Sequence, residues 1–192
     1  MDKSERIIGP HGGYRKLRSF QTAQTVYDAT IIFCDRFVEK NTRTRDQMIQ
    51  AARSGVQNIA EGSMASATSK KTELKLTSVA RASLEELLLD YEDFLRQHGL
   101  RLWGKDSPEA IAVREKYKSD GSDMSDGSDR SDPYSIRTAA AETAANTLIC
   151  LINQASFLLG RQMRKLDASF LNEGGFSERL YKARIKSRTG RD

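Results

Sequence analysis

Long stretches in which apolar residues recur at steps of three and four residues dominate this chain. The clearest runs from 70 to 98 and contains the stripe Leu74, Thr77, Arg81, Leu84, Leu88, Tyr91 and Leu95. This spacing places the side chains on one face of an α-helix and is typical of a seam between packed helices. The stretches 19–41, 45–61 and 138–167 repeat the pattern. Because only 3 prolines interrupt 192 residues, each stretch can form a long helix.

Four amphipathic helices, each with one wide apolar face, bury those faces most simply in a four-helix bundle. No segment shows the alternation of polar and apolar residues that marks a surface strand. We therefore predict an all-α, up-down-up-down four-helix bundle. We expect Ser19 and Ser69 to cap the first and third helices. Gly62 and Gly99 are expected to end the second and third, with Gly62 in the left-handed conformation.

The predicted bundle occupies residues 14–172 and is flanked by segments of different composition. Residues 1–13, which end in Gly-Pro-His-Gly-Gly, are expected to be a flexible leader. Residues 173–192 are a basic C-terminal tail. An acidic insertion over 104–137, mixed or disordered in character, separates the third and fourth helices and includes a short helix after Pro108.

The acidic insertion contains the tract SDGSDMSDGSDRSD over 119–132, whose aspartates recur at every third residue. An EF-hand needs oxygen ligands at alternate positions and a Glu at the twelfth. We therefore favour a solvated linker over a weak calcium site. The tract carries a net charge of −4 within a chain of net charge +5, so the remainder carries +9. A basic body is typical of proteins that bind a polyanion such as nucleic acid, and a basic but merely solvated surface is an equal alternative on charge alone.

The sequence also indicates a cytoplasmic protein. The longest apolar runs are a few residues long, which is too short to span a bilayer. The first residues lack the apolar core of a signal peptide. Cys34 and Cys150 lie alone within apolar helical stretches, which favours buried thiols in a reducing compartment over a disulfide.

Residue patterns of the common catalytic centres are missing from the sequence. A four-ligand zinc site would need both cysteines and both histidines, and none of these stands at ligand spacing. There is no phosphate-binding Gly-rich loop with Lys-Ser/Thr, no Gly-x-Ser-x-Gly elbow and no Glu-x-x-His pair. His98 follows Arg96 too closely for the Arg and His of a helical ribonuclease, and we expect it at a helix C-terminus. We predict no enzyme, no cofactor and no metal site.

Cations gather at the starts of two predicted helices and in the tail. We expect them to contact phosphates without reading bases; they are Arg43, Arg45, Lys70, Lys71, Lys75, Arg179, Lys182, Arg184, Lys186 and Arg188. Arg81, in contrast, falls on the apolar stripe of its helix. We expect it to be buried beside an acidic partner, since a buried cation needs one.

The second helix ends with the motif Asn58-Ile-Ala-Glu-Gly62, which a small polar connector and then Ser83-Leu-Glu-Glu-Leu87 follow. The side chains of Asn58 and Glu61 share a face and are expected to tie the connector through its backbone. This pattern, with Gly62, Ser83 and Glu86 as further motif residues, resembles a bacterial four-helix bundle family. The family includes proteins encoded in intervening sequences of 23S ribosomal RNA genes and the accessory protein of diversity-generating retroelements.

The resemblance covers about residues 13–98, and its opening Gly-Tyr-Arg-Lys-Leu is similar to the Tyr-x-x-Leu start of the family. The fourth helix agrees by pattern only. The chain departs from the family at Ala51-Ala52-Arg53-Ser54-Gly55-Val56, where members commonly have a paired Arg before Ser-Ile. The acidic tract and basic tail look like additions, close to the variant called the four-helix bundle suffix domain.

The resemblance implies a non-enzymatic bundle that assembles as a homopentamer and binds nucleic acid, RNA in preference to DNA. It also implies a partner such as a reverse transcriptase or another RNA-processing protein. With the basic body, it predicts a nucleic-acid-binding accessory protein. The role of the acidic tract is left open, and one role it could have is to mimic phosphate and occupy the basic patch. The alternative is a protein-only scaffold whose apolar faces serve self-assembly or docking. A nuclease with an unrecognised site is a third, weaker reading.

Overall fold

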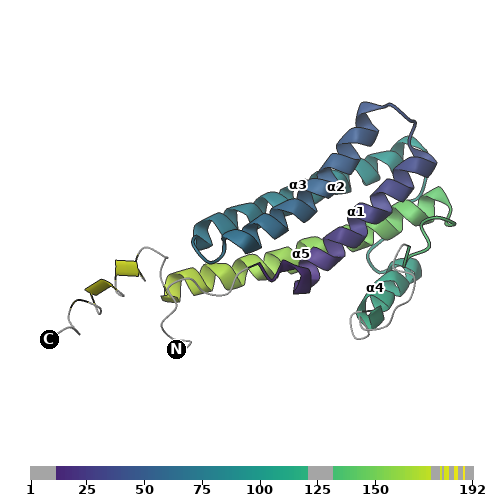
Figure 1. Ribbon diagram of the computed structural model, residues 1–192. Coiled ribbons are helices and arrows are strands. Elements are labelled where there is room, and N and C mark those ends of the chain that lie inside the picture. The colour runs from purple at the N-terminus through teal and green to yellow at the C-terminus, as the bar shows by residue number, and fades with distance from the viewer. Residues whose placement is uncertain are drawn as a thin grey trace.

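The computed structural model describes residues 12–120 and 132–173, together with residues 178, 180, 181, 184, 185 and 188 (Figure 1). Throughout this described part the regular structure is helical and contains no strand, which confirms the predicted all-α class. The elements are a short 3₁₀ helix η2 (Tyr14–Lys16) and the α-helices α1 (Arg18–Phe37), α2 (Arg43–Ala65), α3 (Lys70–Gln97), α4 (Pro108–Asp120) and α5 (Ala141–Glu173).

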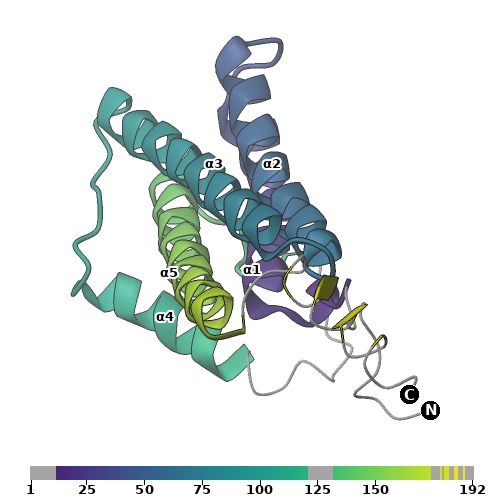
Figure 2. The same ribbon diagram turned by 90° about the vertical axis from the view of Figure 1, so that its left-hand side faces the viewer.

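The long helices pack against one another in antiparallel pairs. The helix α2 packs against both α1 and α3, and α5 packs against α1 and α3 on the other side. Ser19 near the start of α1 contacts Gln162 near the end of α5. The helix α4, the short helix expected after Pro108, lies alongside α5, outside this set of long helices (Figure 2).

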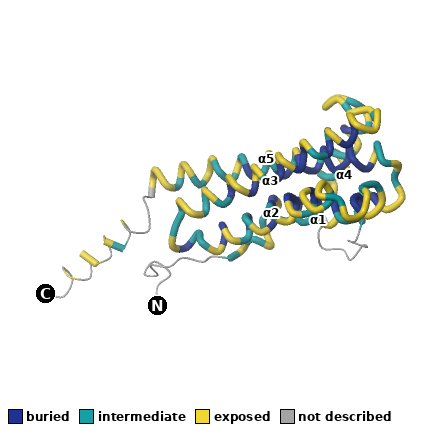
Figure 3. Tube along the Cα trace, turned by 90° about the horizontal axis from the view of Figure 1, so that it is seen from above, coloured by how far each residue is buried: buried dark blue, intermediate teal, exposed yellow. Residues whose placement is uncertain are grey.

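Buried apolar side chains recur turn by turn along α1, α2, α3 and α5 and form one continuous core (Figure 3). At its centre the ring of Phe33 meets the rings of Tyr91 and Phe94 edge-on, each at a centroid distance of 4.9 Å. Such edge-to-face contacts add to the free energy gained by burial. The hydroxyl of the fully buried Tyr91 donates a hydrogen bond to Thr30 Oγ1 at 3.1 Å. This bond satisfies a polar atom that would otherwise destabilise the core.

Arg81 lies outside this core, contrary to the expectation that it is buried with an acidic partner. It is exposed, whereas Ala80 beside it is fully buried. An α-helix turns once every 3.6 residues, so a stripe spaced by three and four residues drifts around the helix. At this turn the core-facing position is therefore Ala80.

Of the two predicted N-caps, the structure confirms one, while α2 and α5 begin at Arg43 and Ala141 instead of 45 and 138. Ser69 caps α3 as predicted, and its hydroxyl accepts a hydrogen bond from the Thr72 amide at 3.1 Å. The first helix begins before Ser19: Leu17 occupies the N-cap position and provides no side-chain cap. The hydroxyl of Ser19 serves instead as a donor to α5. Gly99 follows α3 with a φ of 64°, the left-handed conformation that favours glycine.

Gly62 does not end α2, which continues to Ala65. The expected left-handed stop is therefore wrong. Gly62 is instead buried against α3, where an added Cβ would lie 3.3 Å from the Glu73 carbonyl oxygen and 3.4 Å from Leu76 Cβ. Gly55, two turns earlier, is close to Leu84 in the same manner. The missing side chains allow α2 and α3 to approach closely.

The fifth helix is longer than the predicted stretch 138–167. By length and composition, the span Ala141–Asn172 is the one helix among the described residues that is apolar enough to cross a membrane. However, 61% of its most apolar window is buried inside the protein, against α1 and α3. This burial is typical of a core helix.

The ends of the acidic tract are ordered. Residues 119 and 120 form the last turn of α4. The carboxylate of Asp132 accepts hydrogen bonds from the Ile136 and Arg137 amides, both at 2.7 Å, and so shapes the turn that leads to α5. Residues 121–131, which carry the rest of the tract, and the leader residues 1–11 lie outside the described residues.

Candidate nucleic-acid interface

The cations predicted from the sequence form two separate groups. Arg43 and Arg45 stand at the start of α2, whereas Lys70, Lys71 and Lys75 follow its end. The helix has 23 residues, and at 1.5 Å per residue its ends are roughly 33 Å apart. The two groups therefore do not form one patch. Of the predicted tail residues, Arg184 and Arg188 are exposed, and Arg179, Lys182 and Lys186 lie outside the described residues.

The arginines at the start of α2 are surrounded by acidic groups. The guanidinium of Arg45 forms an ion pair with Asp35 on α1, and its Nε is buried without a hydrogen-bond partner. Arg43 shares an open groove of about 360 Å³ with Asp46 and Glu86. The mixed charge of this end makes it a weak attractor for a polyanion.

The motif residue Asn58 supports the contact between α2 and α3 and does not tie down the connector that joins these helices. The amide of Asn58 donates hydrogen bonds to the Ser54 carbonyl oxygen at 2.9 Å and to Ser54 Oγ at 3.1 Å. Ser54 Oγ in turn lies 2.9 Å from Ser83 Oγ on α3. Glu61 is exposed. The expected tie from Asn58 and Glu61 to the connector is therefore wrong, since Asn58 supports the α2–α3 contact.

The lysines at the start of α3 lie at the other end of the molecule. Lys71 and Lys75 are exposed. The ammonium group of Lys70 contacts the Ser169 hydroxyl and holds the start of α3 against the end of α5. This contact places the end of α5 beside the start of α3.

A groove that sequence reasoning missed opens at this same end. It has a volume of about 570 Å³ and lies between α1, α5 and the α2–α3 connector; we call it the α1–α5 groove. Its cationic lining residues are Arg18, Arg161 and Lys165, all exposed. Glu73 also lines it, and burial raises the pKa of that carboxyl against the opposing effect of Lys70.

The α1–α5 groove joins two basic segments that are distant in the sequence. The first contains Arg15, Lys16 and Arg18, and the second contains Arg161, Arg164 and Lys165. The antiparallel packing of α1 and α5 brings them together, and the hydrogen bond from Ser19 Oγ to Gln162 Oε1, 3.0 Å long, fixes their register. The sequence contained one indication of this basic surface, because residues 143–166 contain no Asp or Glu.

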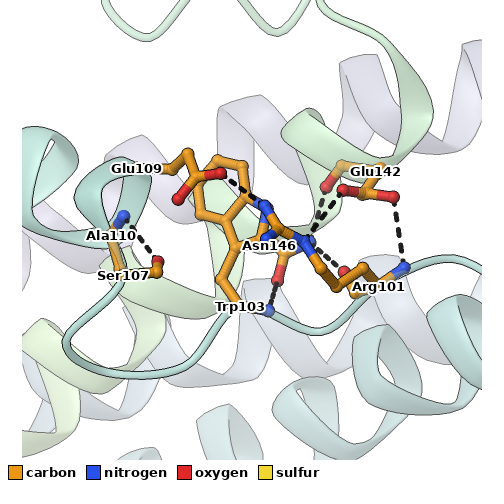
Figure 4. A network of polar contacts seen from close by, with 7 residues as sticks. All are labelled: Arg101, Trp103, Ser107, Glu109, Ala110, Glu142 and Asn146. Carbon is orange, nitrogen blue, oxygen red and sulfur yellow. Dashed lines mark hydrogen bonds and ion pairs between the residues drawn. The ribbon is translucent and has the colours of Figure 1, made fainter.

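The end of the molecule opposite the α1–α5 groove carries a polar network with a structural role (Figure 4). Asn146 on α5 accepts a hydrogen bond from the Trp103 amide at 2.8 Å and donates one to the Arg101 carbonyl oxygen at 2.9 Å. Arg101 also pairs with Glu109 on α4 and Glu142 on α5. These contacts hold the extended segment after α3 against α4 and α5, since its backbone groups find partners there.

The described residues bring no catalytic groups together. His98 is the C-cap of α3, as predicted, and its Nδ1 lies 2.8 Å from the Phe94 carbonyl oxygen. In the described part of the chain, no group of three His, Cys, Asp or Glu side chains is placed to hold a metal ion. Both cysteines are free thiols, and burial raises the pKa of Cys34 to about 12. A thiol with so high a pKa is a poor nucleophile at neutral pH.

Comparison with known proteins adds no relative to this description. No protein-family model matches the chain, and neither a curated protein nor a solved structure does.

Proposed function

We propose that this protein is a non-enzymatic accessory protein that binds nucleic acid on a basic surface of an up-down-up-down four-helix bundle. The bundle consists of α1, α2, α3 and α5. The observation that carries the proposal is the gathering of cations from three separate segments at one end of the molecule. They comprise Arg18, Arg161 and Lys165, which line the α1–α5 groove, and the exposed residues Arg15, Lys16, Lys71, Lys75 and Arg164 elsewhere at this end.

Such a surface attracts a polyanion through phosphate contacts, each of which releases counterions. Residues 143–166 contain no carboxylate, and the first acidic residue after the cations of α5 is Asp167. Two parts of the proposal depend on the family resemblance rather than on this surface. They are the preference for RNA over DNA, and a homopentamer that works with a reverse transcriptase or another RNA-processing protein. The proposed cytoplasmic location depends on the sequence composition instead.

The proposal is tested by fluorescence anisotropy with a labelled 20-nucleotide RNA over a series of salt concentrations. The triple variant Arg18→Gln, Arg161→Gln, Lys165→Gln removes the cations of the α1–α5 groove. We expect weaker binding and a salt dependence whose slope falls by about 2, at roughly 0.7 for each contact with a single strand. The control Lys40→Gln changes an exposed cation just after α1, at the other end, and is expected to bind as the wild type. Failure of the wild-type protein to bind RNA at low salt would refute the proposal.

A second candidate function, a protein-only scaffold, is favoured by one observation. Val79 and Leu89 on α3 are 39% and 57% exposed, and their spacing of ten residues places them on the same side of the helix. Exposed apolar residues that share a face can form a contact between protein molecules. Light scattering on nucleic-acid-free protein decides between the candidates. A stable oligomer that Leu89→Lys dissociates, together with no RNA affinity, would favour the scaffold.

A further inference from the structure

One aromatic side chain stands exposed within the basic part of α5. Phe157 is 55% exposed, although its helix neighbours Leu159 and Ala155 are completely buried. The guanidinium carbon of Arg161 lies 6.0 Å from the centre of the Phe157 ring. Packing in the core does not account for this phenylalanine, and its large apolar ring is accessible to a binding partner.

The cations around Phe157 follow the geometry of the helix. Arg161 and Arg164 lie four and seven residues after Phe157, so the three side chains share one face of α5. Arg161 also lines the α1–α5 groove together with Lys165. An aromatic ring thus stands at the border of a cationic groove, and Arg161 belongs to both.

We infer that Phe157 is a stacking platform for an unpaired base, and that the ligand of this surface is single-stranded nucleic acid. Arg161, Arg164 and Lys165 then hold the flanking phosphates. Single-strand binding proteins combine a positive groove for the backbone with aromatic rings for the bases. In a duplex the bases are already stacked and paired, so an exposed ring on a helix face finds no base to stack on. The inference depends on the proposed function and specifies its ligand.

Charge argues against a second copy of this chain as the occupant of this face. The face has no carboxylate between residues 143 and 166, and it presents two arginines beside the ring. A second copy of the same face would set like charges against each other, which disfavours self-association. A strand with alternating bases and phosphates complements both the ring and the cations.

The test uses a labelled 16-nucleotide RNA of mixed sequence and the duplex that it forms with its complement. We expect Phe157→Ala to weaken binding of the single strand roughly tenfold, as the loss of one stacked base does, with the duplex and the salt dependence unaffected. Arg161→Gln, in contrast, should lower the slope of the salt dependence by about 0.7. Phe157→Trp should retain affinity, and fluorescence of the new indole should be quenched by the single strand only.

Phe170→Ala is the matched control. Phe170 lies on the same helix, is 42% exposed, and stands 13 residues away on the other side of α5. We expect this variant to bind as the wild type. Equal losses on single strand and duplex with Phe157→Ala, or no loss at all, would overturn the inference and leave the proposed function intact. A change of oligomeric state with Phe157→Ala would also overturn it. If the wild type binds neither RNA, the proposed function fails as well.

Discussion

The Ser19 hydroxyl on α1 donates a hydrogen bond to Gln162 Oε1 on α5, across 143 positions of sequence. The bond is 3.0 Å long, and both residues line the α1–α5 groove. Arg18 precedes Ser19, and Arg161 precedes Gln162, so the same contact sets the spacing of two cations. A single polar pair therefore connects helix packing to the layout of the basic surface.

Removing this pair should affect stability and binding together. Ser19→Ala is expected to lower the free energy of unfolding by about 1 kcal/mol, because Ser19 is buried and Gln162 loses its donor. Binding of RNA should weaken as the two cationic segments lose their fixed register. Urea denaturation of Ser19→Ala, Gln162→Ala and the double variant measures the coupling between the two side chains. Strictly additive losses would show that the contact contributes nothing to stability.

Replacement of two helical glycines by alanine should change the stability of the protein in opposite directions. Gly160→Ala adds a Cβ whose nearest neighbour is the mobile end of Arg164 at 3.8 Å, so the gain in helix propensity should stabilise the protein by about 1 kcal/mol. Gly62→Ala places its Cβ 3.3 Å from the Glu73 carbonyl oxygen, a backbone atom that can move only with α3. We expect it to destabilise. Thermal unfolding compares them, and equal stabilisation by both would contradict the close contact of α2 and α3.

The core could be predicted from the sequence because helical periodicity is a local signal. Leu84, Leu88 and Leu95 are buried where the stripe of residues 70–98 placed them. The error at Arg81 came from treating that stripe as straight, although it drifts around the helix. The Ser69 cap was predictable because its partner is three residues away, whereas Ser19 bonds to a partner 143 residues away.

The basic surface was harder to predict than the core. Its two segments, 15–18 and 161–165, meet only because α1 and α5 pack antiparallel, and no local pattern reports that meeting. Arg43 and Lys71, both expected to contact phosphates, lie at different ends of the molecule because the length of α2 separates them. The exposure of Phe157 also depends on the packing of α5, since an apolar residue in an apolar helix is otherwise expected to be buried.

Asp90 on α3 should make stability depend on pH. Burial raises the pKa of its carboxyl above the ordinary value of 3.8, and the nearby Glu86 and Asp93 add to the shift. The folded state therefore binds the proton more tightly than the unfolded state, and stability falls as the pH rises through the interval between the two pKa values. Asp90→Asn removes the charge and should be more stable than the wild type at pH 7.

The advantage of Asp90→Asn should shrink as the pH falls through the ordinary carboxyl pKa of 3.8 and disappear near pH 3, where the wild-type carboxyl is protonated in both states. Asp167→Asn is the control, because Asp167 is exposed and lies on α5 instead of α3. Unfolding free energies from urea denaturation between pH 3 and pH 7 provide the comparison. A difference between Asp90→Asn and wild type that does not vary with pH would contradict the raised pKa.

Substitutions at Arg45 should change stability without changing RNA binding, and substitutions at Lys71 and Lys75 should do the reverse. Only 20% of the Arg45 side chain is exposed, and its guanidinium is engaged with Asp35 across α1 and α2. Arg45→Gln should cost about 1 kcal/mol in unfolding free energy and leave the RNA affinity unchanged. The double variant Lys71→Gln, Lys75→Gln alters two exposed side chains at the start of α3, at the same end of the molecule as the α1–α5 groove. It should leave stability within about 0.5 kcal/mol of the wild type and weaken RNA binding. Urea denaturation and anisotropy on the same samples report both quantities. The reverse outcome, with Arg45 governing affinity, would place the phosphate contacts at the start of α2 instead of beside the groove.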